Sequence, residues 1–183
     1  MTDATAVPSM MNAANAVTVA RLVLTPLLIV LILDRGATWE VFALGMTIGL
    51  SDMLDGWLAR RSRTTSSGAF LDPLADKVLV LGCMFTLVAE GIYSLVPVAL
   101  IAGRELVISA YRSYWGRRGV SIPARRSAKL KTWFQGLAIA LTLCPATADA
   151  RWLWISLLWI AVAFTLVTGV QYLLDGSRSH ETA

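Results

Sequence analysis

Six long apolar segments limit what this chain can fold into. They cover roughly residues 16–34, 38–60, 69–90, 94–115, 130–147 and 151–174, with Gly, Pro or charged residues at every break. A bilayer core about 30 Å thick needs about 20 helical residues, and each segment meets or nearly meets that length. With 56% hydrophobic residues, 15% charged residues and a mean hydropathy of +0.64, the chain is too apolar for an ordinary soluble domain. We therefore predict an all-α integral membrane protein with six transmembrane helices.

Basic residues concentrate in two of the connections between these segments. The second connection holds Arg60, Arg61 and Arg63, and the fourth holds Arg117, Arg118, Arg125, Arg126, Lys129 and Lys131. The positive-inside rule places both connections in the cytoplasm, and six spans then place both termini there too. Because the cations behind the net charge of +4 lie beside hydrophobic spans, they favour anionic membrane lipids as partners over nucleic acid.

The chain shows no internal repeat, so we predict one membrane domain over residues 1–183, with flexible tails at 1–11 and 176–183. A juxtamembrane segment leads into the first span. That span lacks a small-residue cleavage pattern, and we expect it to stay in the protein. The expected location is the cell membrane, with multiple passes.

Two pairs of aspartates lie close together in the sequence, Asp52 with Asp55 and Asp72 with Asp76. Spacings of three and four place each pair on one face of a helix. Four carboxylates at one point repel each other unless a cation lies among them, and an all-oxygen shell suits Mg²⁺, Mn²⁺ or Ca²⁺. Salt bridges to arginines such as Arg104, or a proton relay in a transporter, are the alternatives.

The full pattern resembles the signature of the CDP-alcohol phosphatidyltransferases, Asp-x-x-Asp-Gly-x-x-Ala-Arg followed by Gly-x-x-x-Asp-x-x-x-Asp. Its eight fixed positions are all present, at Asp52, Asp55, Gly56, Ala59, Arg60, Gly68, Asp72 and Asp76. The resemblance implies a homodimeric enzyme with a cytoplasm-facing site. The enzyme would transfer the phosphatidyl group of CDP-diacylglycerol to an alcohol and release CMP.

The same resemblance implies roles for individual residues. Asp52, Asp55, Asp72 and Asp76 would hold two divalent ions, Mg²⁺ or Mn²⁺, and Asp76 would also act as the base. The donor nucleotide would be held by Asn15, Thr18, Gly56, Ala59, Arg60, Thr65, Ser66 and Gly68. From the residues alone, the small side chains could instead serve helix packing. The stripe of Asn15, Thr18 and Arg21 could likewise be capping and interfacial anchoring.

Three further stretches resemble the bacterial phosphatidylglycerophosphate synthases within this family. They are Asp-Pro-Leu-Ala-Asp-Lys at 72–77, the pair Arg104-Glu105, and 128–132 with Gln135. The resemblance favours sn-glycerol 3-phosphate as the acceptor. Cations suited to its phosphate are Arg21, Arg104, Arg112, Lys129 and Lys131.

Other activities remain open at this point. A cardiolipin synthase of the same superfamily would use phosphatidylglycerol as acceptor, and another CDP-alcohol phosphatidyltransferase would use a different alcohol. An intramembrane prenyltransferase or a proton-coupled transporter would belong to a different class. Metal-dependent release of CMP separates the first two from the last two.

Overall fold

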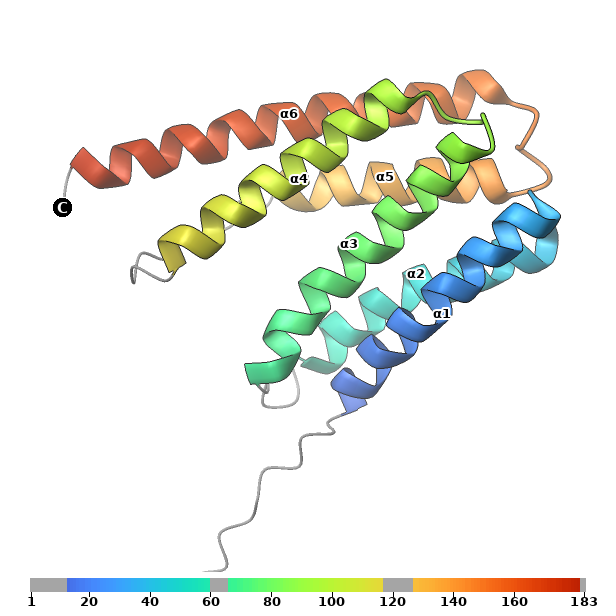
Figure 1. Ribbon diagram of the computed structural model, residues 1–183, viewed down its shortest axis with the longest axis horizontal. Helices are drawn as coiled ribbons and strands as arrows, with labels where there is room; N and C mark the ends of the chain where they lie inside the picture. Colours follow the sequence, from blue (N-terminus) through green and yellow to red (C-terminus); the bar gives the residue numbers. More distant parts are fainter. Residues whose placement is uncertain (1–12, 60–65, 117–126, 182–183) are drawn as a thin grey trace, which may run out of the picture.

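The computed structural model describes the backbone of residues 13–59, 66–116 and 127–181, and side chains within 17–51, 74–115 and 130–172. That part of the chain forms six α-helices and no strand (Figure 1). They are α1 (Ala13–Arg35), α2 (Trp39–Ala59), α3 (Ser66–Ala89), α4 (Leu95–Gly116), α5 (Ser127–Leu143) and α6 (Arg151–Glu181). The prediction of an all-helical chain is confirmed.

The observed helices match the six apolar segments to within three residues, except at the ends of α5 and α6. α5 ends at Leu143, before the expected 147, because the residue that precedes Pro145 disfavours the helical conformation. α6 runs to Glu181, so part of the tail expected at 176–183 is helical. The side chains of that last part, and residues 1–12, lie outside the described structure.

Two glycines form turns that reverse the chain. Gly36 and Gly91 have φ values of +62° and +69°, a left-handed conformation that costs little without a Cβ. Gly36 N–H donates to the Ile32 carbonyl at 2.9 Å and closes the last turn of α1. The α1–α2 and α3–α4 connections therefore stay short, and consecutive helices run in opposite directions.

The helices form two groups that share one apolar core. α1 packs against α2 and α3, while α6 packs against α4 and α5, and contacts of α5 with α2 and α3 join the groups. Leu28, Ile48, Met84, Ile101 and Trp154 lie in the core and are almost fully buried. Because the helices alternate in direction, odd-numbered helices begin and even-numbered helices end on the same side of the bundle (Figure 1).

Among the residues whose side chains are described, two stretches are long and apolar enough to cross a membrane, Val17–Arg35 and Arg151–Tyr172, and Trp39–Ser51 is a shorter apolar stretch. Their exposed side chains include Val23, Val30, Trp152 and Val170. An apolar surface of this kind has no favourable partner in water, and lipid chains supply one.

Candidate active site

The structure places all four motif aspartates on the same side of the bundle. Asp52 and Asp55 lie in the last two turns of α2, and Asp72 and Asp76 lie in the first half of α3. The side chains of Asp52, Asp55 and Asp72 are outside the described residues, and only the carboxylate of Asp76 can be placed. The two aspartate pairs therefore lie toward the end of α2 and the start of α3, and their convergence on one point stays a prediction.

Asp76 forms an ion pair with Arg21 of α1. Arg21 Nη1 donates to Asp76 Oδ1 at 2.5 Å. The Arg21 side chain is 1% exposed, whereas that of Asp76 is 38% exposed. The arginine is therefore part of the packed α1–α3 interface, and it holds a carboxylate that still reaches open space.

A cavity of about 160 Å³ opens beside Asp76 between α3, α4 and α5. Its walls are formed by Asp76, Lys77, Val80, Leu81, Glu105, Lys131, Thr132 and Gln135. Small-molecule pockets usually measure about 300–1,000 Å³, so this one suits a ligand much smaller than a lipid. Its lining combines two ammonium groups, Lys77 and Lys131, with two carboxylates, Asp76 and Glu105.

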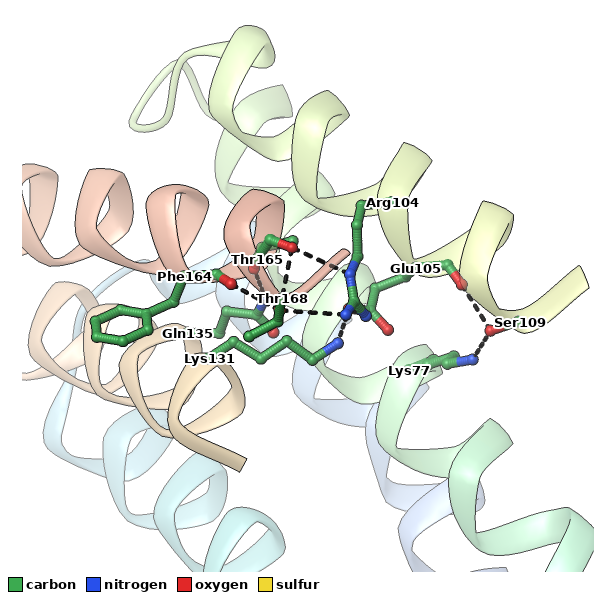
Figure 2. Close-up of polar contacts among 9 residues, drawn as sticks. All are labelled: Lys77, Arg104, Glu105, Ser109, Lys131, Gln135, Phe164, Thr165 and Thr168. Carbon is green, nitrogen blue, oxygen red and sulfur yellow. Dashed lines mark hydrogen bonds and ion pairs between the residues drawn. The ribbon is translucent and has the colours of Figure 1, made fainter. Parts of the chain in front are cut away.

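Both cavity lysines are bound to side chains of α4 (Figure 2). Lys131 Nζ donates to Glu105 Oε1, and Lys77 Nζ donates to Ser109 Oγ. Ser109 Oγ in turn donates to the Glu105 backbone carbonyl at 2.6 Å. Glu105 and Ser109 are four residues apart on one face of α4, so this face fixes both lysines.

Arg104 lies behind this cavity and contacts α6. Its Nε donates to the Thr165 carbonyl at 3.1 Å, and its Nη2 donates to Thr168 Oγ1 at 3.2 Å. Its Nη1 donates to Glu105 Oε1 at 3.2 Å, so Arg104 and Lys131 share one carboxylate oxygen (Figure 2). Arg104 is not among the residues that line the cavity.

The remaining predicted residues are distributed as follows. Thr18 is almost fully buried in α1, one turn before Arg21, and Arg112 is exposed on α4. Arg60 and Thr65 lie outside the described residues. Only the backbone is described for a further set: Asn15, Gly56, Ala59, Ser66, Gly68 and Lys129.

The described side chains contain no group of three or more His, Cys, Asp or Glu residues able to hold a metal ion. Asp76 is the one motif carboxylate among them. The donor set as a whole is nonetheless chemically suited to a hard divalent cation, because the four motif residues supply carboxylate oxygens from α2 and α3. The residues present thus fit the expected metal.

Lys77, Gln135 and Glu105 line the cavity, although the sequence indicated them only as markers of a subfamily. One signal pointed to Gln135, which follows Lys131 by four residues and therefore lies on the same face of α5. No local spacing links Lys77 to α4.

The bundle and its charged cavity define a helical, membrane-associated protein whose polar residues lie between apolar helices. The sequence profile of the CDP-alcohol phosphatidyltransferases matches residues 11–167. The chain belongs to the CDP-alcohol phosphatidyltransferase family.

Several relatives are similar over most of their length. A protein of Pseudomonas fluorescens named CDP-diacylglycerol–glycerol-3-phosphate 3-phosphatidyltransferase is 37% identical, over 89% of this chain and 89% of its own. A Rickettsia typhi protein of the same name is 32% identical over 89% and 96% of the two chains. A probable phosphatidylglycerophosphate synthase of Mycobacterium tuberculosis is 34% identical over 91% of this chain and 82% of the relative.

Proposed function

We propose that this protein transfers the phosphatidyl group of CDP-diacylglycerol to sn-glycerol 3-phosphate, giving phosphatidylglycerophosphate and CMP in phospholipid biosynthesis. The observation that carries the proposal is the cavity that Asp76 shares with Lys77 and Lys131. It combines a carboxylate able to accept a proton with two cations able to hold a phosphate. The names of relatives 32–37% identical to this chain agree with it.

The membrane arrangement is part of the proposal. Residues 1–183 would form one domain with six membrane spans and both termini in the cytoplasm. Charged residues inside spans usually face the bundle interior and serve function. Arg21, Arg104, Glu105 and Lys131 fit that pattern, because each side chain is largely buried. Arg21 and Lys131 lie in the first halves of α1 and α5, on the side that the basic connections assign to the cytoplasm, and Arg104 and Glu105 lie near the middle of α4.

We assign the divalent ions, two of Mg²⁺ or Mn²⁺, to Asp52, Asp55, Asp72 and Asp76. When bound, such ions neutralise charge that develops on the phosphates. Donor binding is assigned to Asn15, Thr18, Gly56, Ala59, Arg60, Thr65, Ser66 and Gly68. Arg60 suits the diphosphate because a guanidinium binds phosphate oxygens in a bidentate way.

The protein's own residues account for the transfer as follows. Lys77 and Lys131 bind the phosphate of glycerol 3-phosphate and hold its terminal hydroxyl toward Asp76. The hydroxyl oxygen forms a bond to the phosphatidyl phosphorus, and the bond from that phosphorus to the oxygen of the cytidylate phosphate breaks. CMP leaves with the bonding electrons, and the Asp76 carboxylate takes the hydroxyl proton. Arg21 keeps that carboxylate in place.

The candidate acceptor cations then fall into three places. Lys131 contacts the acceptor directly, with Lys77 as an addition. Arg112 and Lys129 attract the doubly charged acceptor from the cytoplasmic side, and Arg21 and Arg104 act behind the ligand. Lys77 and Lys131 at the cavity suit the doubly charged phosphate of glycerol 3-phosphate better than the singly charged phosphodiester of phosphatidylglycerol, which disfavours a cardiolipin synthase. A homodimer in the membrane completes the proposal.

Lys131→Met tests this assignment, and Arg35→Met is the control. Arg35 is the last residue of α1, at the end of the bundle away from the cavity, where it is half exposed and pairs with Glu40. Losing a charge-assisted contact of about 1.5–3 kcal/mol should raise the KM for glycerol 3-phosphate by roughly 10–150-fold. The KM for CDP-diacylglycerol should change little. Equal effects on both substrates, or none, would remove Lys131 from the acceptor site.

A further inference from the structure

Gly169 of α6 gives Arg104 of α4 a place to lie flat against the helix. A Cβ atom at Gly169 would meet Arg104 Cγ at 3.1 Å and Nε at 3.2 Å, and most real Cβ contacts are longer. An alanine at this position would require Arg104 to shift by a few tenths of an ångström. The lack of a side chain at Gly169 therefore allows the Arg104 side chain to lie close to the α6 backbone.

The neighbouring threonines of α6 hold the guanidinium group of Arg104. Thr165 offers its carbonyl to Arg104 Nε, and Thr168 offers its hydroxyl to Nη2. The Thr168 hydroxyl is itself oriented, because it donates to the Phe164 carbonyl at 2.6 Å (Figure 2). Both hydrogen-bond acceptors on α6 are therefore held by α6 itself, independently of Arg104.

Arg104 then sets the position of Glu105 and, through it, of Lys131. The carboxylate oxygen Glu105 Oε1 accepts from both cations, and the three side chains are only 9–13% exposed. Two buried cations share one carboxylate, so the cluster keeps one net positive charge. An isolated buried charge is costly, so this cluster is ready to receive an anion.

The same segment of α6 also holds α5. Thr165 Oγ1 accepts from Gln135 Nε2 at 3.2 Å, and Gln135 lines the cavity. Two walls of the cavity, Glu105 on α4 and Gln135 on α5, are therefore positioned from one stretch of α6. None of Thr165, Thr168 and Gly169 lines the cavity itself.

We propose that the α6 segment 165–169 is a positioning element for acceptor binding. It orients Arg104, which orients Glu105, which holds the Lys131 ammonium where the acceptor phosphate binds. Arg104 is thus a positioning residue that does not touch substrate. The inference rests on the proposed function, because it takes Lys131 to bind the phosphate of glycerol 3-phosphate.

Gly169→Ala tests the positioning element, with Gly103→Ala as the matched control. Gly103 immediately precedes Arg104 on α4, and a Cβ there has nothing within 4 Å. We expect Gly169→Ala to raise the KM for glycerol 3-phosphate roughly tenfold, with the KM for CDP-diacylglycerol unchanged, and Gly103→Ala to change neither. An unchanged acceptor KM, or equal rises for both substrates in Gly169→Ala, would overturn the proposal.

A second pair of variants keeps the test decisive if Gly169→Ala does not fold. Thr168→Val removes the hydroxyl that Arg104 donates to, while Thr168→Ser keeps it. Thr168→Val should raise the acceptor KM several-fold, on the scale of a single hydrogen bond, and Thr168→Ser should restore it. A purely structural role would give the two variants similar acceptor KM values and would contradict the proposal.

The double variant Gly169→Ala with Lys131→Met shows whether the effect passes through the lysine. Without the ammonium, the alanine should cause no further rise in the acceptor KM. Independent, multiplying effects would refute the route through Glu105. If Lys131→Met alone leaves the acceptor KM unchanged, the acceptor assignment under the proposed function fails. If only Gly169→Ala and Thr168→Val are silent, the failure is confined to the α6 element.

Discussion

Arg21 and Asp76 form an ion pair between α1 and α3, with Arg21 Nη1 2.5 Å from Asp76 Oδ1. The arginine is buried and the carboxylate is partly open to the cavity. The buried guanidinium donates to the carboxylate and so holds it in one orientation. The pair thereby connects the packing of two helices to the group proposed as the base.

Arg21→Met should lower kcat at least tenfold, because Asp76 loses the partner that orients it. Removing a cation next to a metal ligand should not weaken metal binding, so the Mg²⁺ concentration for half-maximal activity should not rise. The kcat of Arg21→Lys should lie between those of the wild type and Arg21→Met, because lysine retains the charge without the planar guanidinium. An unchanged kcat in Arg21→Met would show that Asp76 needs no such partner.

Asp52→Asn, Asp55→Asn and Asp72→Asn should each abolish activity through loss of metal. Removing one of several crowded carboxylates relieves repulsion, so the thermal stability of the metal-free variants should equal or exceed that of the wild type. Turnover and thermal unfolding in excess chelator measure the two effects. Near wild-type turnover in Asp52→Asn at ordinary Mg²⁺ would show that the metal assignment is wrong.

Asp76→Asn should behave differently from the other three. It leaves the buried Arg21 with a neutral partner, and we expect the free energy of unfolding to fall by about 1–3 kcal/mol, at the low end because Asp76 is partly exposed. Turnover should be lost while CDP-diacylglycerol still binds. Titration with the donor and chemical unfolding check both points, and retained turnover would exclude Asp76 as the base.

Arg60→Ala should instead weaken the binding of the donor, CDP-diacylglycerol. The loss of a charge-assisted hydrogen bond to the diphosphate should reduce CDP-diacylglycerol affinity by about 1.5–3 kcal/mol. The variant protein should keep its affinity for glycerol 3-phosphate, which serves as the internal control. A donor titration that matches the wild type would remove Arg60 from the nucleotide site.

The helices could be predicted because their signal is local. Each apolar run and each Gly or Pro break is readable within about 20 residues, and the ends of α2 and α4 agree with the prediction to within one residue. The end of α6 at Glu181 could not be predicted in the same way, because its last turns carry charged and polar residues in place of an apolar run.

The orientation of buried cations could not be predicted from spacing. Arg104 and Arg112 lie eight residues apart on one face of α4, which suggested a shared direction toward the aspartates. The structure shows Arg104 bonded to Thr165 and Thr168 and packed against the buried Gly169, partners more than 60 residues away in the sequence. Lys77 was missed for the same reason, since its partner Ser109 lies on another helix.

Product analysis with purified protein tests the central claim most directly. CDP-diacylglycerol, glycerol 3-phosphate and phosphatidylglycerol are supplied together with Mg²⁺, and CMP and lipid products are measured with and without excess chelator. We predict release of CMP in step with phosphatidylglycerophosphate, and no product once the chelator is present. Cardiolipin as the product with glycerol 3-phosphate left unused, or no release of CMP at all, would contradict the account.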